Sequence, residues 1–384
     1  MDILIVHPKL TWRGAEKLSV NLASALQSHG HNVAYLTLFV ESKGIPTGIK
    51  KVNLIVPSLY IQKILRFNDL FFMLFGFWVL LFLVFKNAKK FQIINVHNIP
   101  STWVGAIVGR IYHKPVVWTV HDVPKDISWK HKSSIIEYVL WFVASSFIDK
   151  LLVKRIDVVI TQCKNVANEV KTRYKKETRI ILPAVDSIYL KKIIGKRFFS
   201  NTISGKFVFL SASHMHFRKN QKTIIKAFSK FSKKVINSSL LLAGDGPDKP
   251  KLATLVNDLS LEHKVFFTGI LSENRLAKLY ESSNVLLLAS IEEPWGLTPF
   301  EALAMGTPVI VSKFAGAYET IRGKGLGYFS KPSINSFYAT MLDVYLNYEK
   351  AKKVALRGKR WVRKNMMPDR YAGEYELIYK SLIG

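Results

Sequence analysis

Short runs of mainly apolar residues alternate along the chain with longer segments whose apolar residues recur at helical spacing. The first pair is the run at 2–7, Asp-Ile-Leu-Ile-Val-His, followed by a segment at 14–28. In that segment, Leu18, Leu22, Ala25 and Leu26 form one apolar stripe, which predicts an amphipathic helix. Further strand-like runs lie at 32–38, 92–97, 115–124, 157–161, 178–182, 206–211, 239–244, 264–269, 284–289 and 308–312. Because buried strands alternate with helices throughout, the pattern predicts an α/β fold with two parallel sheets.

The chain has 384 residues, which is enough for two α/β domains of ordinary size. The stretch at 191–205 is polar, basic and contains glycine, so we interpret it as a linker. This interpretation gives a first domain at 1–190 and a second at 206–365, with a terminal segment at 366–384. Helices are expected at about 335–363 and 368–382.

An acidic turn between two of the predicted strands is the strongest chemical signal. Glu293 follows the run at 284–289, where open parallel sheets bind ligands. Gly296 allows close backbone approach. Leu297 and Thr298 fall at a helix start, where free N–H groups favour an anion such as a pyrophosphate. We expect Glu301 to lie one turn into that helix and to point back toward its mouth, so that both carboxylates can accept hydrogen bonds from sugar or ribose hydroxyls. Two glutamates at this spacing are also common as solvated helix charges.

The residues around these glutamates resemble a known sequence signature. Residues 293–310 read Glu-Pro-Trp-Gly-Leu-Thr-Pro-Phe-Glu-Ala-Leu-Ala-Met-Gly-Thr-Pro-Val-Ile. This run resembles the donor site of the retaining glycosyltransferases of family 4, which have the GT-B fold. The resemblance implies two Rossmann-like domains whose parallel sheets face across an interdomain cleft, with the C-terminal helix crossing back to the first domain. It also implies transfer of a sugar from a nucleotide diphosphate sugar, without a metal or other cofactor.

The resemblance assigns roles to several side chains. Glu293 would hold hydroxyls of the donor sugar and His121 would lie on the sugar's far side, so these two are the candidate catalytic residues. Glu301 would hold the ribose, and Leu271 would lie beside the nucleotide base, after the strand at 264–269. Gly14 matches the second glycine of the family's Gly-Gly-Ala-Glu turn, whereas the first glycine is replaced by Arg13.

The phosphate-binding loop after the strand at 206–211 departs from the family in one respect. Lys219 matches the lysine that neutralises the donor pyrophosphate. The family's arginine position holds Ser213 or His214 here, depending on a one-residue gap. Arg218, next to the lysine, is the candidate that compensates for this loss.

Composition narrows the choice of partners. The formal net charge is +29 and is spread over both halves of the chain, so nucleic acid, anionic lipid headgroups and anionic glycans are all possible partners. No zinc-finger or RNA-recognition signature is present, and we expect no nucleic-acid partner. The one cysteine, Cys163, rules out a disulfide framework and a cysteine metal cluster. A strand begins at Met1 with no basic segment before it, so we expect no signal peptide.

The uncharged run from Leu70 to Phe85 has three interpretations. It is shorter than the roughly 20 residues that a bilayer span requires. It could be a buried core helix, a helix embedded in the membrane interface with Lys86, Lys89 and Lys90 reaching for headgroups, or a true span. A second apolar and basic segment follows at 133–156. We expect a cytoplasmic protein bound peripherally to an anionic membrane surface.

The function predicted from these features is transfer of a sugar to a hydroxyl acceptor, such as a lipid-linked saccharide or a surface polysaccharide precursor. Two alternatives remain open: another GT-B activity, such as a sugar-nucleotide epimerase or a phosphorylase, and a non-catalytic polyanion-binding protein of the same fold. The sequence does not name the donor sugar, the base, the acceptor, the linkage or the oligomeric state.

Overall fold

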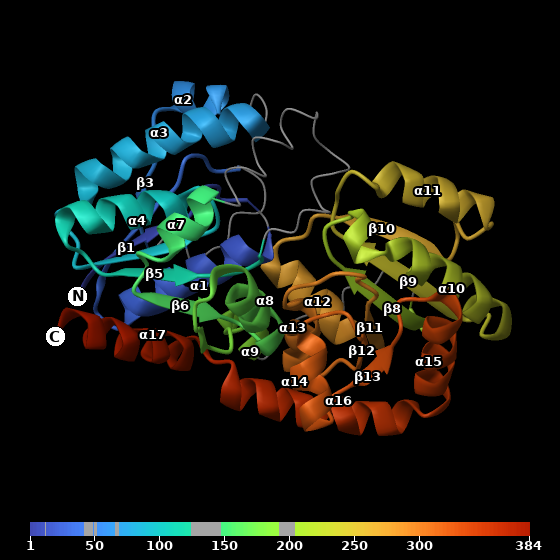
Figure 1. Cartoon of the computed structure of the whole chain (residues 1–384). Coiled ribbons are helices and arrows are strands. Elements are labelled where there is room, and N and C mark those ends of the chain that lie inside the picture. The colour runs from blue at the N-terminus through green and yellow to red at the C-terminus, as the bar shows by residue number, and fades with distance from the viewer. Residues whose placement is uncertain (12, 42–48, 50–51, 66–68, 124–146, 192–203) are drawn as a thin grey trace. The chain divides into compact units, whose positions relative to one another are not determined.

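The computed structural model of the chain describes residues 1–11, 13–41, 49, 52–65, 69–123, 147–191 and 204–384 (Figure 1). The chain forms two compact units. The first comprises Met1–Ala184 and Pro368–Gly384, and the second comprises Val185–Met367. Each unit contains one parallel β-sheet with helices, so the predicted α/β fold with two parallel sheets is confirmed.

The sheet of the first unit has seven strands in the order β3-β2-β1-β4-β5-β6-β7, and every neighbouring pair is parallel. Its strands are β1 (Asp2–Val6), β2 (Asn32–Leu36), β3 (Asn53–Ile55), β4 (Ile93–His97), β5 (Val116–Thr119), β6 (Val158–Thr161) and β7 (Arg179–Ile180). Its described helices are α1 (Gly14–Ser28), α2 (Leu59–Ile64), α3 (Asp69–Ala88), α4 (Ser101–Tyr112), α7 (Asp149–Val153), α8 (Lys164–Tyr174) and α17 (Pro368–Ile383).

The sheet of the second unit has six parallel strands in the order β10-β9-β8-β11-β12-β13. The strands are β8 (Phe207–Ala212), β9 (Ser238–Ala243), β10 (Val265–Gly269), β11 (Val285–Leu288), β12 (Val309–Ser312) and β13 (Tyr328–Ser330). The helices are α9 (Ser187–Leu190), the 3-10 turn η3 (Phe217–Lys219), α10 (Gln221–Lys234), α11 (Lys249–Asp258), α12 (Glu273–Ser282), α13 (Thr298–Met305), α14 (Ala317–Lys324), α15 (Ile334–Leu346) and α16 (Tyr348–Asn365).

Each sheet has one point at which the strand order reverses. In the first unit this switch point lies between β1 and β4, and in the second it lies between β8 and β11. At a switch point the loops that follow the two strands leave in opposite directions, and open α/β sheets bind ligands there. The loops after β1, β4, β8 and β11 are therefore the first places to look for function.

Several predicted boundaries need comment. The helix predicted at 14–28 matches α1. The single helix predicted at 335–363 is wrong, because the chain breaks at Asn347 into α15 and α16. Residues 185–190, which we assigned to the first domain, belong to the second unit, where α9 packs on α12 and α13. Most of the predicted linker at 191–205 and of the segment at 133–156 lies outside the described residues.

The C-terminal helix α17 returns to the first unit, as predicted, and packs against α1. Its tyrosines Tyr371, Tyr375 and Tyr379 are buried in the core of that unit. All three of their hydroxyls also make hydrogen bonds. Asn95 donates to Tyr379 at 2.5 Å, the hydroxyls of Thr119 and Tyr375 lie 3.1 Å apart, and those of Tyr371 and Tyr375 lie 3.4 Å apart. Helix α17 is therefore an integral part of the first unit's core.

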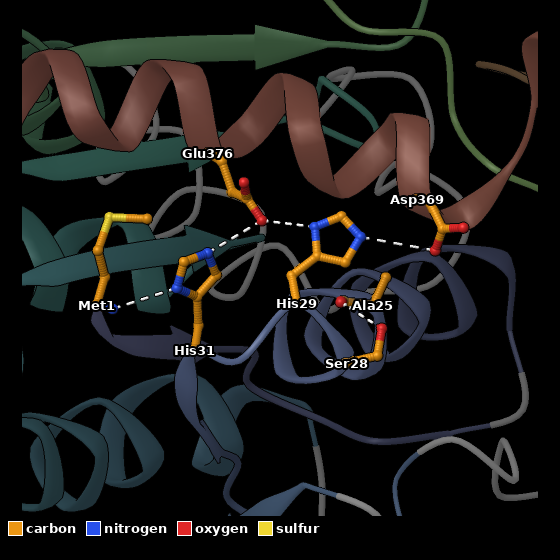
Figure 2. A network of polar contacts seen from close by, with 7 residues as sticks. All are labelled: Met1, Ala25, Ser28, His29, His31, Asp369 and Glu376. Carbon is orange, nitrogen blue, oxygen red and sulfur yellow. Dashed lines mark hydrogen bonds and ion pairs between the residues drawn. The ribbon is translucent and has the colours of Figure 1, made fainter.

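A polar network reinforces this attachment (Figure 2). Glu376 on α17 lies 2.6 Å from His29 Nδ1 and 3.0 Å from His31 Nε2, and Asp369 lies 3.6 Å from the other nitrogen of His29. Burial acts to raise the pKa of Glu376, but hydrogen bonds from the two histidines outweigh it and leave this pKa below its usual value. The network joins α17 to the residues between α1 and β2.

Replacing this carboxylate should destabilise the first unit in a pH-dependent way. Because the folded-state pKa is lowered, Glu376 stabilises the fold above its unfolded pKa of about 4.3, and this stabilisation is lost as the pH falls through the lower folded value. Glu376→Gln should reduce stability by about 1 kcal/mol at pH 6–7, or roughly 2–4 °C in Tm, and by progressively less as the pH falls below the unfolded pKa.

Thermal unfolding of the two proteins across this pH range is the measurement. The control is Glu349→Gln, which removes an exposed carboxylate paired with Lys352 in the second unit. A Tm difference between wild type and Glu376→Gln that persists unchanged at pH 3 would show that the carboxylate charge is not the cause.

Candidate active site

The switch point of the second unit brings together two of the predicted site residues. Lys219 ends the loop after β8, and Glu293 lies in the loop after β11. The ammonium of Lys219 donates a hydrogen bond to Glu293 Oε2 and forms an ion pair with it. Ser290 Oγ donates to the same oxygen at 3.1 Å. Both charged side chains are mostly buried, with 26% and 11% of their surfaces exposed. A cation and an anion thus meet where the sheet offers a ligand site.

The backbone of the acidic turn is held by the loop after β12. Gly316 N–H donates to Glu293 O at 2.8 Å, and Ala317 N–H donates to Trp295 O at 2.6 Å. A Cβ atom at position 316 would lie 2.0 Å from the carbonyl oxygen of Pro294, so only glycine permits this approach. The indole of Trp295 is buried and stacks on Phe300 at 5.0 Å. These contacts fix the backbone position of Glu293 and therefore the origin of its side chain.

The start of α13 follows directly. Gly296 has a φ of +93°, which favours glycine over any other residue. Phe300 and Glu301 donate to the carbonyl of Leu297, and Pro299 has no N–H group. The N–H groups of Leu297 and Thr298 therefore have no acceptor within the helix and carry its positive end. These N–H groups follow the turn of Glu293, whose side chain pairs with Lys219.

Glu301 lies one turn into α13 and is buried. Its side chain accepts a hydrogen bond from the hydroxyl of Tyr280 at 2.8 Å. Tyr189 of α9 packs edge-on against Tyr280 at 5.7 Å. Burial, followed by the charges of Glu301 and Glu273, raises the pKa of Tyr189 well above its usual value. The acidic side chain is thus held by tyrosines that the local sequence pattern did not reveal.

The remaining predicted donor-site residues lie in neighbouring loops. Arg218 is half-buried, and its carbonyl accepts the N–H of Ile291 at 2.9 Å, which ties the loop after β8 to the loop after β11. Leu271 follows β10 and is 7% exposed, whereas Ile270 before it is 41% exposed. Gly246, in the turn after β9, has no room for a Cβ, because that atom would lie 2.3 Å from the carbonyl oxygen of Met215. Three loops therefore pack together at this edge of the sheet.

His121 lies in the first unit, after β5, and belongs to a cluster of imidazoles. Its Nε2 is 2.8 Å from His97 Nδ1, and its Nδ1 is 2.9 Å from Gln162 Nε2. The ring of His7 lies 5.7 Å from that of His97 and 6.3 Å from that of His121. Burial and the neighbouring His7 lower the pKa of His121 to about 3, and burial lowers the pKa of His7 to about 4, partly offset by a hydrogen bond with the Lys9 backbone. These rings are therefore neutral at physiological pH.

Two further observations complete the site. Gly14 opens α1 and is exposed, next to the exposed Arg13. In the described part of the chain, no group of three or more histidine, cysteine, aspartate and glutamate side chains has the arrangement that would hold a metal ion. Sequence reasoning missed Tyr280, Ser290, Gly316 and His97. Of these, Ser290 and His97 could have been suspected from their positions at the ends of predicted strands.

The comparisons with known proteins agree with this geometry. Residues 12–187 match the family described as Glycosyltransferase Family 4, and residues 194–361 match that described as Glycosyl transferases group 1. The chain belongs to the family 4 glycosyltransferases. Together with the two parallel-sheet units, these matches establish that it has the GT-B fold and is an enzyme of the glycosyltransferase type.

Two relatives of this glycosyltransferase are named for an O-antigen chain and for a glucosyldiacylglycerol. It is 28% identical to the O-antigen chain mannosyltransferase RfbU of Salmonella typhimurium over 69% of this chain and 68% of the relative. It is 26% identical to the alpha-monoglucosyldiacylglycerol synthase of Acholeplasma laidlawii over 76% and 75%. The Anabaena protein Alr3699/HepE, solved in complex with UDP and glucose, has the same fold, with a TM-score of 0.78, 18% identity and complete coverage of both chains.

The glycine at position 316 offers a direct test of the turn. Gly316→Ala should displace the Pro294 carbonyl and, with it, Glu293, because the added methyl group meets backbone atoms that cannot rotate away. We expect a loss of about 1–3 kcal/mol in stability, as for other overpacked sites, and a clear loss of nucleoside diphosphate affinity. Thermal unfolding and calorimetry measure the two effects.

Gly323→Ala is the matched control. Gly323 lies in the adjacent helix α14, and a Cβ there would have no neighbour within 4 Å. It should leave both quantities unchanged or slightly raise stability. Equal behaviour of the two variants would mean that the turn does not depend on glycine at 316.

Proposed function

We propose that this glycosyltransferase moves a sugar from a nucleotide diphosphate sugar to a hydroxyl acceptor with retention of anomeric configuration. The observation that carries the proposal is the pairing of Lys219 with Glu293 at the second unit's switch point, beside the free N–H groups at the start of α13. One side chain suits a diphosphate and the other suits sugar hydroxyls, and together they match the two halves of a nucleotide sugar.

The groups around the diphosphate contribute most to stabilising the leaving group. The departing nucleoside diphosphate gains negative charge, which Lys219, Arg218 and the N–H groups of Leu297 and Thr298 stabilise. Gly296 lets the phosphate approach the backbone. On the nucleoside side, Glu301 holds the ribose and Leu271 lies beside the base. Tyr280 orients the Glu301 carboxylate for this task.

The donor sugar becomes oxocarbenium-like as its bond to the diphosphate weakens. Glu293 holds its hydroxyls. The neutral imidazole of His121 is the second candidate group for the sugar, because it can donate or accept a hydrogen bond. In the family's retaining mechanism an oxygen of the donor phosphate assists the acceptor hydroxyl. The reaction then needs neither a protein nucleophile nor a metal ion.

For the acceptor we propose a lipid-linked saccharide or a surface polysaccharide precursor. The names of the two relatives, an O-antigen chain mannosyltransferase and a glycosyldiacylglycerol synthase, support this class. Acceptors of this kind are held at a membrane surface, so the enzyme must reach that surface.

Helix α3 provides the means to reach it. Its face toward the core buries Phe72, Leu80, Val84 and Ala88. Among the described side chains of α3, the exposed large apolar ones are Phe75, Trp78, Phe82 and Phe85, at 39%, 66%, 64% and 45%. Their spacing places them on one face, which we name the aromatic face of α3. The buried face fits the core-helix interpretation, and the aromatic face is the surface that the interfacial interpretation requires.

Charge favours a membrane as the partner of this aromatic face. Lys86, Lys89 and Lys90 at the end of α3 are exposed, and the whole chain carries a net charge of +29. Each basic residue near an anionic surface contributes about 1 kcal/mol. No helix in the described part of the chain has both the length and the apolar character needed to cross a bilayer. We propose peripheral binding to an anionic membrane, on its cytoplasmic face.

The two glutamates should separate affinity from turnover. Glu301→Ala should weaken binding of the preferred nucleoside diphosphate by about ten- to a hundredfold, because charged hydrogen bonds are worth roughly 1.5–3 kcal/mol. Glu293→Gln should keep this affinity, because Lys219 loses its anionic partner and stays available for the diphosphate. The same variant should lower kcat, because the contacts of Glu293 with the sugar strengthen in the transition state. Calorimetry and nucleotide release measure the two quantities.

Tyr280→Phe serves as the control for Glu301, because it removes the supporting hydroxyl and leaves the carboxylate in place. It should reduce affinity much less than Glu301→Ala does. If Glu293→Gln loses nucleotide binding but retains turnover, or if Glu301→Ala binds like the wild type, the assigned roles are wrong.

Flotation with liposomes tests the membrane proposal. Binding should increase with the fraction of anionic lipid, decrease with salt, and weaken when Trp78 and Phe82 are changed to serine, because their exposed rings enter the interface. Phe77 is a poorer choice, since it is half-buried and its ring lies 6.4 Å from that of Trp103.

The matched control is Leu377→Ser, which removes an equally exposed apolar side chain from α17 of the same unit. This variant should float like the wild type. Equal flotation on neutral and anionic liposomes, or none on either, would refute the proposal that charge directs the enzyme to the membrane.

A further inference from the structure

The switch point of the first unit holds two imidazoles, His7 and His97, that the donor chemistry does not use. His7 follows β1 directly, His97 is the last residue of β4, and β1 and β4 are the neighbouring strands at which the order reverses. His97 is fully buried and His7 almost fully. Together with His121 after β5, they put three imidazoles at the edge of the sheet where ligands bind.

With the Gln162 amide placed so that Nε2 donates, the hydrogen bonds of the cluster give one consistent arrangement of ring protons, in which His121 Nδ1 accepts at 2.9 Å. The one proton of neutral His121 is then on Nε2 and is donated to His97 Nδ1, 2.8 Å away. His97 therefore carries its own proton on Nε2. This nitrogen is buried and has no hydrogen-bond partner among the described residues.

A buried N–H group without a partner is rare, because it costs roughly 1–3 kcal/mol. Proteins retain such groups where a ligand completes the bonding. The stacked ring of His121, 5.1 Å from that of His97, and the tilted ring of His7 hold the imidazole of His97 in place. Asn98, the next residue, lies 3.4 Å from His7 Nε2 and restrains the second ring.

The charge of the cluster selects the kind of ligand. Burial, followed by the neighbouring His121 and His7, lowers the pKa of His97 well below its usual value, and the pKa values of the other two rings are also lowered. Neutral rings give an anion no Coulomb attraction to offset its desolvation. A hydroxyl group loses little on burial when it is hydrogen-bonded, and it can accept the N–H of His97 while donating elsewhere.

Metal binding is the other use that clustered histidines suggest. A zinc site needs ligand nitrogens about 2.0–2.1 Å from one common point. Here, two of the facing nitrogens are engaged with each other, at 2.8 Å, as donor and acceptor. Within the described ranges of the chain, no set of three ligands has metal-binding geometry. The arrangement therefore favours a hydroxyl ligand over a cation.

We propose that the first unit's switch point binds a hydroxyl group of an uncharged acceptor saccharide through His97 Nε2. This inference rests on the proposed function, because it takes the bound saccharide to be the acceptor. It adds the residue that contacts the acceptor and the chemical nature of the group that is contacted. His121 supports the acceptor-binding imidazole through its hydrogen bond with His97.

The first experiment observes the nitrogen directly in the wild-type full chain. Histidine labelled with ¹⁵N gives separate NMR signals for protonated and unprotonated ring nitrogens. The probes are methyl α- and β-glycosides of glucose, galactose, mannose and N-acetylglucosamine, with inorganic phosphate as the anionic counterpart. At least one glycoside should shift the His97 Nε2 signal in a saturable way, whereas phosphate should not. The signals of the exposed His113 and His263 should not move.

Three outcomes would overturn the proposal. A shift of His97 Nε2 caused by phosphate would indicate an anion site. A nucleotide sugar that produces the glycoside's shift by itself would assign the cluster to the donor. The absence of any saturable shift across the glycoside panel would mean that the cluster binds no saccharide. Failure of the proposed function gives a different result. If a glycoside shifts the His97 signal but no nucleotide binds, the saccharide site is supported and only the proposed function is refuted.

A pair of variants gives an independent readout. His97→Asn should raise KM for the acceptor by about tenfold, as expected for the loss of one hydrogen bond, and should leave nucleoside diphosphate affinity unchanged. His113→Asn is the matched control, because it makes the same substitution at an exposed position in the same unit. The backbone of His113 is left-handed, a conformation that asparagine tolerates. Equal KM values for the two folded variants would contradict a contact between His97 and the acceptor.

Discussion

The whole structure depends on one constraint, namely that every strand in both sheets is parallel to its neighbours. Such strands can be joined only by crossovers, so the carboxyl ends of all strands in a unit lie at one edge. The order reverses once in each unit, between β1 and β4 and between β8 and β11. The charged pair of the second unit and the imidazole cluster of the first lie at these two reversals, as ligand sites do in open α/β sheets.

The two sites differ in their electrostatics. In the second unit, Lys219 and Glu293 keep opposite charges in contact, beside the positive start of α13. This arrangement suits a charged diphosphate joined to a polar sugar. In the first unit, burial keeps His7, His97 and His121 neutral, which suits hydroxyl groups. An enzyme that joins a charged donor to a neutral acceptor needs both kinds of surface.

Sequence patterns predicted the local features well and the tertiary ones poorly. Helix α1 and the strands around Glu293 follow from apolar periodicity, and Gly296 has the left-handed φ that its turn position indicated. The contact of Lys219 with Glu293 joins residues 74 positions apart, and only the strand order creates it. The burial of Glu301 depends on Tyr280 from another helix. The break at Asn347 and the two faces of α3 were likewise set by packing, which periodicity alone does not specify.

The central claim is that this chain transfers a sugar from a nucleotide donor with retention. The most direct measurement follows the reaction by NMR with purified protein, a panel of UDP-, GDP- and ADP-sugars, and saccharide acceptors. Our account predicts acceptor-dependent release of one nucleoside diphosphate, and a product whose new linkage has the donor's anomeric configuration. A product of inverted configuration would contradict the proposed mechanism. Release of nucleoside diphosphate with none of the donors would contradict the transferase assignment itself.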